Sequence, residues 1–179
     1  MKVIADTPYF DLIQIDDKHG LHVKQTSVAV LPYTVNDSGI VDQLGILKEL
    51  NHLREGDYAY TLITGTIEDS DESVLATAVR ELAEEGGITA SSDDLNRWVF
   101  LGNFHDSKDT DRTIPTFAVD VTGLPQIEPA TDGSHQELNS VLELKDVNEV
   151  LTSSKETLVL ASFLRLFNIM YQKSFKNAK

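Results

Sequence analysis

The sequence predicts an α/β protein of the mixed α+β kind, an α/β/α sandwich in which one mixed β-sheet lies between helices. Three observations support this fold. Residues 9–67 are rich in β-branched and aromatic residues with turn-forming runs between them, and apolar residues then recur at helical spacing over 72–85. Two further strand-like segments and a final apolar helix follow. Strands on both sides of a central helix are typical of a sheet that helices cover on both faces.

The first half of the chain contains four predicted strands, over 9–15, 22–33, 40–50 and 58–67. A turn-forming run, Asp16-Asp17-Lys18-His19-Gly20, separates the first two. Gly65 lies inside the fourth strand, which has the strongest pattern. A single glycine inside a strand often marks a close approach of the backbone to another group.

The central helix is predicted over 72–85 because Leu75, Val79 and Leu82 recur at helical spacing. Its N-cap candidates are Asp69, Ser70 and Asp71, and Gly86-Gly87 is expected to end it.

Two strands, over 98–104 and 114–121, are predicted after this helix, and Pro115 favours a sheet edge or a bulge for the second. A capping-box pattern from Ser153 to Glu156 predicts a last helix over 153–172. We expect the core stripe of this helix to consist of Leu160, Phe163, Leu164, Phe167 and Tyr171.

Composition limits the classes of function. The 179 residues, 41% of them apolar and 25% charged, fit a single domain over 1–179. The net charge of −14 argues against duplex nucleic acid and anionic membranes as partners, and the absence of cysteine excludes disulfides and thiolate metal sites. The sequence shows neither a signal-peptide pattern nor an apolar run of about 18 residues, so we expect a cytoplasmic protein.

The candidate chemistry lies on the central helix. At about 100° per residue, Glu81, Glu84 and Glu85 share one face of it, and the apolar positions share the opposite face. Clustered carboxylates destabilise an isolated helix unless a cation binds them, and Mg²⁺ or Mn²⁺ prefers such oxygen ligands. The alternative is an ordinary solvated helix face. A backbone carbonyl beside Gly65, such as that of Thr64, could complete a metal site.

This segment resembles the box of the Nudix hydrolase family, Gly-x5-Glu-x7-Arg-Glu-U-x-Glu-Glu-x-Gly-U, where U is aliphatic. The matching residues are Gly65, Glu72 and the run Arg80-Glu81-Leu82-Ala83-Glu84-Glu85-Gly86-Gly87-Ile88. Six residues stand between Gly65 and Glu72 where the pattern has five, and we expect the loop before the helix to absorb the extra one. The strand order also resembles the Nudix sandwich, so the likeness extends over most of the chain.

The resemblance implies Mg²⁺-dependent hydrolysis of a nucleoside diphosphate linked to another group, with Mn²⁺ as a substitute for Mg²⁺. It assigns the metal to Glu81 and Glu85, with Glu84 as a further ligand and the Thr64 carbonyl completing the site. Arg80 and Glu72 would form an ion pair that braces the helix and the loop. Gly65 and Gly87 would be structural positions of the box.

The general base lies outside the box in many family members. The corresponding loop here is Asp132-Gly133-Ser134-His135-Gln136-Glu137. Glu137 is therefore the preferred base, and Glu81 is the alternative. A third possibility is that this segment is a plain surface loop.

Substrate specificity rests on weaker signals. The run Ile63-Thr64-Gly65-Thr66-Ile67-Glu68 resembles a stretch of the ADP-ribose pyrophosphatases, and Arg54 stands where that branch often carries a substrate-binding arginine. Phe104 could stack on a base and Arg112 could pair with a phosphate. Against this branch, Phe104 stands where its members commonly carry a proline.

The expected reaction converts ADP-ribose or a related ADP-sugar to AMP and a sugar phosphate. Dinucleoside polyphosphates, RNA caps and nucleoside triphosphates remain alternative substrates. A Nudix fold that binds a nucleotide without cleaving it is the competing class of function. The resemblance to the ADP-ribose pyrophosphatases favours a homodimer.

Overall fold

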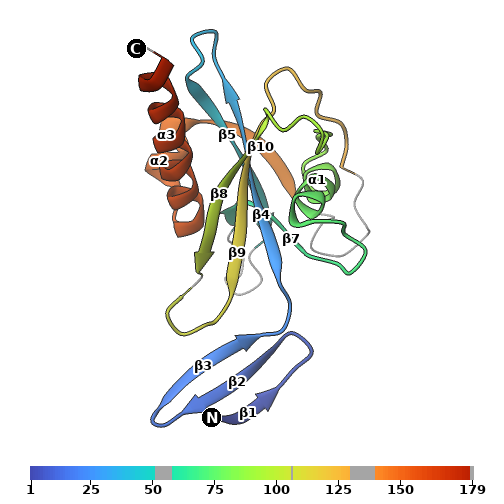
Figure 1. The fold of residues 1–179 in the computed structure, drawn as a ribbon, viewed down its shortest axis with the longest axis vertical. Coiled ribbons are helices and arrows are strands. Elements are labelled where there is room, and N and C mark those ends of the chain that lie inside the picture. Colours follow the sequence, from blue (N-terminus) through green and yellow to red (C-terminus); the bar gives the residue numbers. More distant parts are fainter. Residues whose placement is uncertain (51–57, 106, 130–139, 178–179) are drawn as a thin grey trace.

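A mixed β-sheet forms the centre of the structure, a computed structural model that describes residues 1–50, 58–105, 107–129 and 140–177 (Figure 1). Its strands are β4 (Ser27–Val35), β5 (Val41–Leu50), β6 (Tyr58–Thr61), β7 (Ile63–Thr66), β8 (Trp98–His105), β9 (Thr113–Asp120) and β10 (Val141–Asp146). The main order is β10-β5-β4-β9-β8, with β6 paired to β5 and β7 to β4. Only the β4–β9 pair is parallel among the described strand pairs, which makes the sheet mixed.

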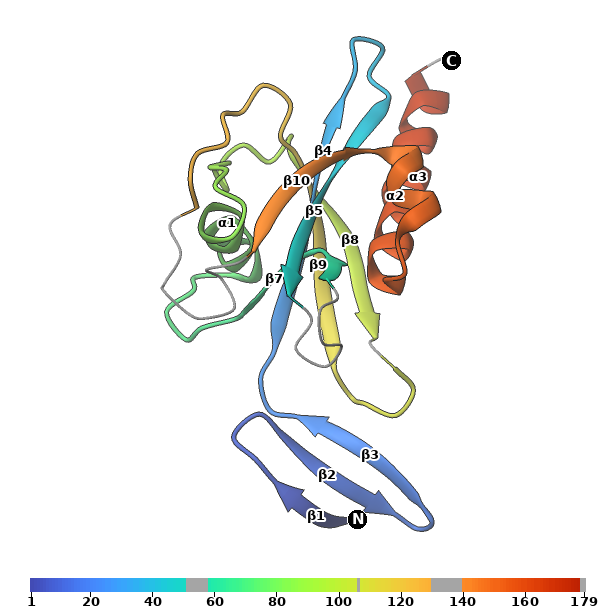
Figure 2. The same ribbon diagram turned by 180° about the vertical axis from the view of Figure 1, so that it is seen from behind.

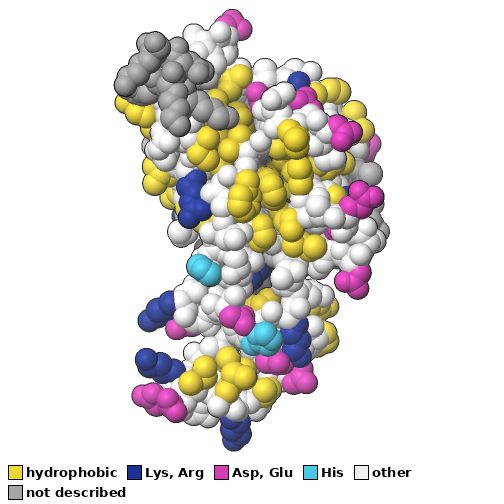
Figure 3. All heavy atoms as spheres, in the orientation of Figure 1, with side chains coloured by type: hydrophobic (Ala, Val, Ile, Leu, Met, Phe, Trp, Pro, Cys, Tyr) yellow, Lys and Arg dark blue, Asp and Glu magenta, His cyan; other side chains and the backbone are white. Residues whose placement is uncertain are grey.

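Helices cover both faces of this sheet (Figures 1 and 2). They are α1 (Val74–Glu84) on one face, and α2 (Val147–Ser153) and α3 (Thr157–Asn177) on the other. Alternate residues of β4 point to opposite faces: Val28 and Val30 belong to the core cluster under α1, whereas Ala29 and Leu31 belong to the cluster under α3. The predicted fold class is therefore confirmed. Figure 3 shows that hydrophobic side chains also gather on the surface between α1 and α3.

A second, three-stranded antiparallel sheet precedes the main one. It consists of β1 (Lys2–Asp6), β2 (Phe10–Ile15) and β3 (Lys18–Val23) and lies beyond one end of the main sheet (Figure 1). The predicted strand over 22–33 is therefore two strands, β3 and β4, in different sheets. Lys18–Gly20, expected in a turn, belong to β3, because the β2–β3 hairpin turns at Asp16 and Asp17 alone.

Helix α1 begins two residues later than the sequence predicts. Ser73 is its N-cap, and the Ser73 hydroxyl accepts a hydrogen bond from the Ala76 N–H, so the cap candidates Asp69, Ser70 and Asp71 were wrong. Gly87 ends the helical segment with a φ of +64°. A side chain at Gly87 would overlap the carbonyl oxygen of Ile127, whose N–H donates to the Gly87 carbonyl. A residue with a side chain is therefore disfavoured at position 87.

The C-terminal helix differs from the prediction in its start and its buried face. Ser153 is the last residue of α2, and α3 begins at Thr157, so Ser153 does not open the last helix. The predicted stripe is only partly correct. Phe163 packs against the core, but Leu164 and Phe167 are exposed, and the fully buried residues are Val159 and Leu166. Sheet packing selects one of two apolar sides of this helix. No described helix is long and apolar enough to span a bilayer.

Strand β9 lies between β4 and β8 and is therefore not at the sheet edge that Pro115 suggested. Its pairing with β4 begins only at Thr116, so the missing N–H of Pro115 removes no hydrogen bond from that ladder. The other prediction for Pro115, a bulge, agrees better with the structure. The neighbouring strand β8 shifts register between Phe100 and Gly102, opposite this part of β9.

Candidate active site

Gly65 and Glu81 form the tightest contact of the site. Gly65 lies on β7 opposite Val28 of β4, and α1 packs beside β7. The Glu81 side chain turns back toward this strand and is only 9% exposed. A Cβ at Gly65 would overlap the Glu81 carboxylate. Glycine is therefore required here because the carboxylate occupies the space of a side chain.

Glu85 approaches the same strand from the C-cap of α1. Its Oε2 accepts a hydrogen bond from the Thr64 N–H at 3.3 Å. Residues four apart share a helix face, which brings Glu81 and Glu85 to the adjacent residues Thr64 and Gly65. The structure thus brings together four of the residues that the sequence selected.

Glu84 is arranged differently. Its side chain is 40% exposed, and its Oε2 accepts a hydrogen bond from Arg80 Nη1 at 2.8 Å; the same nitrogen donates to Glu81 Oε1 at 2.7 Å. In the described parts of the chain, no three His, Cys, Asp or Glu side chains are placed to hold one metal ion together. The structure therefore does not form the predicted three-carboxylate cluster, and Arg80 binds two of its members.

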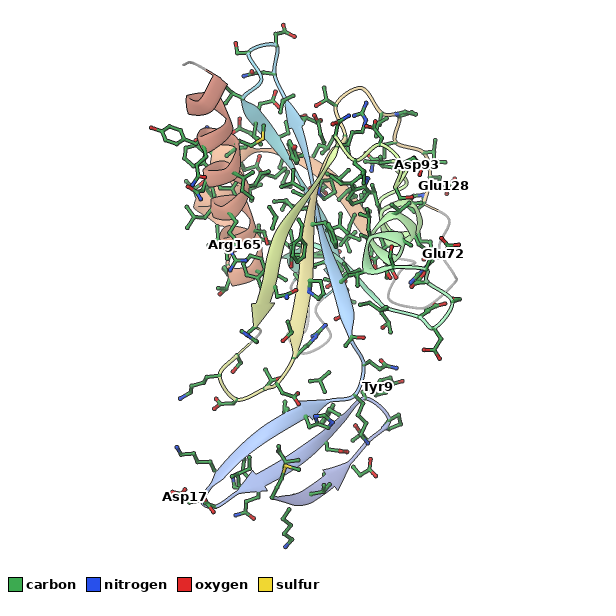
Figure 4. The ribbon with its side chains drawn as sticks, in the orientation of Figure 1. Tyr9, Asp17, Glu72, Asp93, Glu128 and Arg165 are labelled. Atoms are coloured by element: carbon green, nitrogen blue, oxygen red, sulfur yellow. The ribbon has the colours of Figure 1, made fainter. Side chains whose placement is uncertain are left out.

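Asp71, and not Glu72, is the partner of Arg80. Asp71 accepts hydrogen bonds from Arg80 Nε and Nη2 at 3.3 and 3.2 Å, while Glu72 is exposed on the outer side of α1 (Figure 4). The predicted Arg80–Glu72 ion pair is thus corrected. The Arg80 guanidinium, helped by the Glu68 N–H, lowers the pKa of Asp71 to about 2.

A sequence signal for Asp71 existed. Five residues separate it from Gly65, as the box pattern requires, whereas six separate Gly65 from Glu72. Glu72 was nevertheless predicted as the partner of Arg80, because the box pattern has a glutamate and seven residues between it and the arginine.

Arg112 lies close to the box. Its Nη2 donates a hydrogen bond to Ser27 Oγ at 2.5 Å, and Ser27 pairs with Thr66 across β4 and β7. Arg112, Ser27 and Thr66 line a cavity of about 270 Å³, together with Tyr9 and Phe10 of the N-terminal sheet. The Thr66 carbonyl in turn accepts a hydrogen bond from Arg80 at 3.0 Å. Ser27 carried no signal in the sequence, because its position depends on the pairing of distant strands.

Phe104 is not brought to the box. It packs against the core cluster under α3, where the Arg165 guanidinium lies over its ring at 4.1 Å from the centroid. The bulge before Gly102 explains why Phe104 points to the α3 face of the sheet, because one extra residue reverses the alternation of side chains along β8. The predicted stacking of Phe104 on a substrate base beside the box helix is therefore not supported.

Two predicted residues lie outside the described ranges. They are Arg54, the proposed substrate-binding arginine, and Glu137, the proposed base. A larger cavity of about 550 Å³ lies between the β2–β3 hairpin and the loop that precedes β9. It contains none of the predicted site residues.

Comparison with known proteins identifies the family. The NUDIX domain model matches residues 27–165, and no curated protein matches. An ADP compounds hydrolase has a similar structure, with a TM-score of 0.64 and 17% identity over 96% of this chain and 92% of that one. A NUDIX hydrolase from Nitrosomonas europaea has a TM-score of 0.56 and 17% identity over 80% of this chain and 89% of that one. A structure from work on MutT of Aliivibrio salmonicida and Vibrio cholerae has a TM-score of 0.51 and 18% identity over 79% of this chain and 98% of that one.

These likenesses show the fold. Because the first match covers 96% of the chain, it extends into the β1–β3 sheet, which precedes the residues that the family model matches. The family model alone spans well over half of the chain and includes Gly65 and all of α1. The chain belongs to the Nudix hydrolase family.

Proposed function

We propose that this protein is a Mg²⁺-dependent pyrophosphohydrolase that cleaves a nucleoside diphosphate linked to another group. The observation that carries the proposal is the convergence of Glu81 and Glu85 on Thr64 and Gly65 of β7. A buried carboxylate over a strand glycine, with a second carboxylate one helical turn away, is an unusual use of acidic residues if they only solvate a surface.

The residues fit a magnesium ion. Members of this family typically depend on a divalent metal, and Mg²⁺ is usually held by one or two carboxylates together with water and substrate phosphates. Glu81 and Glu85 supply two carboxylates. The Thr64 N–H points to Glu85, and in an extended strand the carbonyl of the same residue points to the same edge. This supports the Thr64 carbonyl as our candidate third oxygen donor, and Glu84 stays a candidate further ligand.

The reaction is attack of water on a phosphorus atom of the diphosphate. The bond from this phosphorus to the bridging oxygen breaks, and two phosphate monoesters leave. A bound Mg²⁺ would neutralise the phosphate oxygens and lower the pKa of water. The protein must also supply a carboxylate that accepts the proton of the attacking water. Glu137 is our candidate for this base, with Glu81 as the alternative.

ADP-ribose or a related ADP-sugar is the substrate that we favour, with AMP and a sugar phosphate as products. One similar structure is named as an ADP compounds hydrolase. The cavity beside Thr66 supports a substrate with a phosphate and a flat ring, because Arg112 can pair with phosphate and Tyr9 and Phe10 offer aromatic surface. Arg54 is a second candidate for binding the substrate.

The test is hydrolysis of a panel of nucleotides. ADP-ribose, an ADP-sugar, a dinucleoside polyphosphate, a capped RNA and a nucleoside triphosphate are each incubated with Mg²⁺ and with a chelator, and released mononucleotide is measured. We expect turnover of ADP-ribose that the chelator abolishes. Binding of ADP-ribose without turnover of any substrate would instead favour a nucleotide-binding module.

Two variants test the assignment of residues. Glu85→Gln is expected to lower kcat by about 100-fold or more without unfolding the protein, because it removes a proposed metal ligand. Glu137→Gln should lower kcat with little change in Mg²⁺ dependence if Glu137 is the base. An unchanged rate for Glu137→Gln would transfer that role to Glu81.

A further inference from the structure

Asp71 has the most extensively bonded carboxylate in the loop between β7 and α1. Its side chain is 8% exposed. Besides its two hydrogen bonds from Arg80, it accepts one from the Glu68 N–H at 3.0 Å and one from Thr77 Oγ1 at 2.9 Å. This carboxylate therefore ties the loop, the first turns of α1 and Arg80 to one point.

Arg80 connects Asp71 to strand β7 and to the carboxylates of α1. Its Nη2 also donates to the carbonyl of Thr66, the residue after Gly65, at 3.0 Å. Its Nη1 contacts both Glu81 and Glu84. A guanidinium presents its donors in a rigid, planar fork, so fixing one side of Arg80 fixes the direction of the other side.

The spacing of the chain agrees with this arrangement. Five residues separate Gly65 from Asp71, and eight separate Asp71 from Arg80 where the family pattern has seven. The extra residue therefore lies after Asp71 and before α1 begins at Val74, in a turn that leaves Glu72 exposed. An insertion at this place leaves the distance from Gly65 to the bracing acid unchanged.

We propose that Asp71, rather than Glu72, is the positioning residue of the site: through Arg80 it holds Glu81 over Gly65 and so sets the affinity for the divalent ion. The inference rests on the proposed function, because it assumes that Glu81 binds that ion. Asp71 acts through Arg80 and does not touch the substrate.

The test compares Asp71→Asn with Glu72→Gln, adjacent substitutions that each remove one charge. Mn²⁺ affinity is measured by electron paramagnetic resonance on the protein without substrate, and Mg²⁺-dependent hydrolysis is measured in parallel. Loss of a group that orients a metal ligand typically costs 10–100-fold in metal affinity or activity. We expect a loss of about this size for Asp71→Asn and less than about twofold for Glu72→Gln. Asp71→Glu, which keeps the charge, should recover part of the loss.

Circular dichroism and thermal melting establish that each variant is folded. If Asp71→Asn does not fold, Thr77→Val removes one hydrogen bond to Asp71 and should weaken Mn²⁺ binding by a smaller factor. Equal affinities for the wild type and these Asp71-directed variants would overturn the proposal, and so would a larger loss for Glu72→Gln. A wild type that binds Mn²⁺ but hydrolyses no substrate would contradict the proposed function instead, and the Mn²⁺ affinities would still decide the role of Asp71.

Discussion

At the scale of single residues, the site depends on an absent side chain. Gly65 does not have a positive φ, so its backbone tolerates alanine, and the nearest obstacle to a side chain is the Glu81 carboxylate. We expect Gly65→Ala to displace Glu81, to lower the free energy of unfolding by about 1–3 kcal/mol and to reduce Mg²⁺-dependent activity at least tenfold. Urea unfolding and the hydrolysis assay measure the two effects.

The matched control for this prediction is a double-mutant cycle. The Glu81→Ala substitution removes the atoms that lie nearest to a Cβ at position 65. Gly65→Ala should then cost less than about 1 kcal/mol, since the two substitutions are coupled through one contact. An undiminished cost in that background would show that the strand itself, and not Glu81, rejects alanine.

The lowered pKa of Asp71 predicts how the free energy of unfolding depends on pH. Its pKa is lowered from 3.8 to about 2 in the folded protein, chiefly by the hydrogen bonds from Arg80. A lowered folded pKa means that the ionised group stabilises the fold above its unfolded pKa and loses this contribution as the pH falls. The wild type should exceed Asp71→Asn in unfolding free energy by on the order of 1–2 kcal/mol at pH 6.

This difference should shrink between about pH 4 and pH 2, as protonation removes the charge that the variant lacks. Urea titrations of both proteins across that range measure it. A difference that stays constant down to pH 2 would show that the hydrogen-bonding geometry of Asp71, and not its charge, provides the stability.

Residue identities could be predicted from the sequence where local spacing determines them. Glu81 and Glu85 are four apart on one helix, so their common direction follows from helical geometry. The role of Asp71 was missed because loop conformation, which has no fixed period, decides whether 71 or 72 faces Arg80. Arg112 was selected as a phosphate-binding candidate, which stays a prediction, and its contact with Ser27 depends on strand pairing that no local pattern encodes.

At the scale of elements, α3 shows how packing selects one of two apolar faces. Leu166 is fully buried under the sheet, and its neighbour Phe167 is 53% exposed. Leu166→Ala should therefore cost about 2–5 kcal/mol of unfolding free energy. Phe167→Ala should cost less than about 1 kcal/mol, although it removes more atoms, because an exposed side chain leaves no cavity. Thermal and urea unfolding of the two variants measure this contrast.

The reverse ranking would restore the stripe that the sequence suggested, with Phe167 and Tyr171 in the core. Most of that stripe was wrong because helical periodicity marks apolar positions but not which neighbour covers them. The central helix was predicted more accurately, since polar and apolar residues there lie on opposite faces and only one side can be buried. Strand ends were missed where turns are short, as at the β2–β3 hairpin.

At the scale of the whole molecule, hydrogen bonds join the N-terminal sheet to the main body. The loop before β9 lies along β3, where the Leu21 N–H donates to the Asp109 carbonyl at 2.8 Å. The Asp111 carboxylate accepts the Val23 N–H at 2.9 Å and pairs with the His22 ring at 2.5 Å. This loop leads directly to Arg112, so docking of the sheet and the position of Arg112 are connected.

Asp111→Ala should therefore loosen the N-terminal sheet without unfolding the main one. We expect amide hydrogen exchange over β3 to rise about tenfold, because Val23 loses its acceptor, while β4 exchanges as in the wild type. Asp109→Ala is the control, because Asp109 contributes its backbone carbonyl to the docking and alanine keeps that group. The loosened sheet should also raise the KM for ADP-ribose more than it lowers kcat, since the sheet lines the cavity beside Thr66 and not the carboxylates. Unchanged exchange over β3 would show that the backbone contacts alone hold the two sheets together.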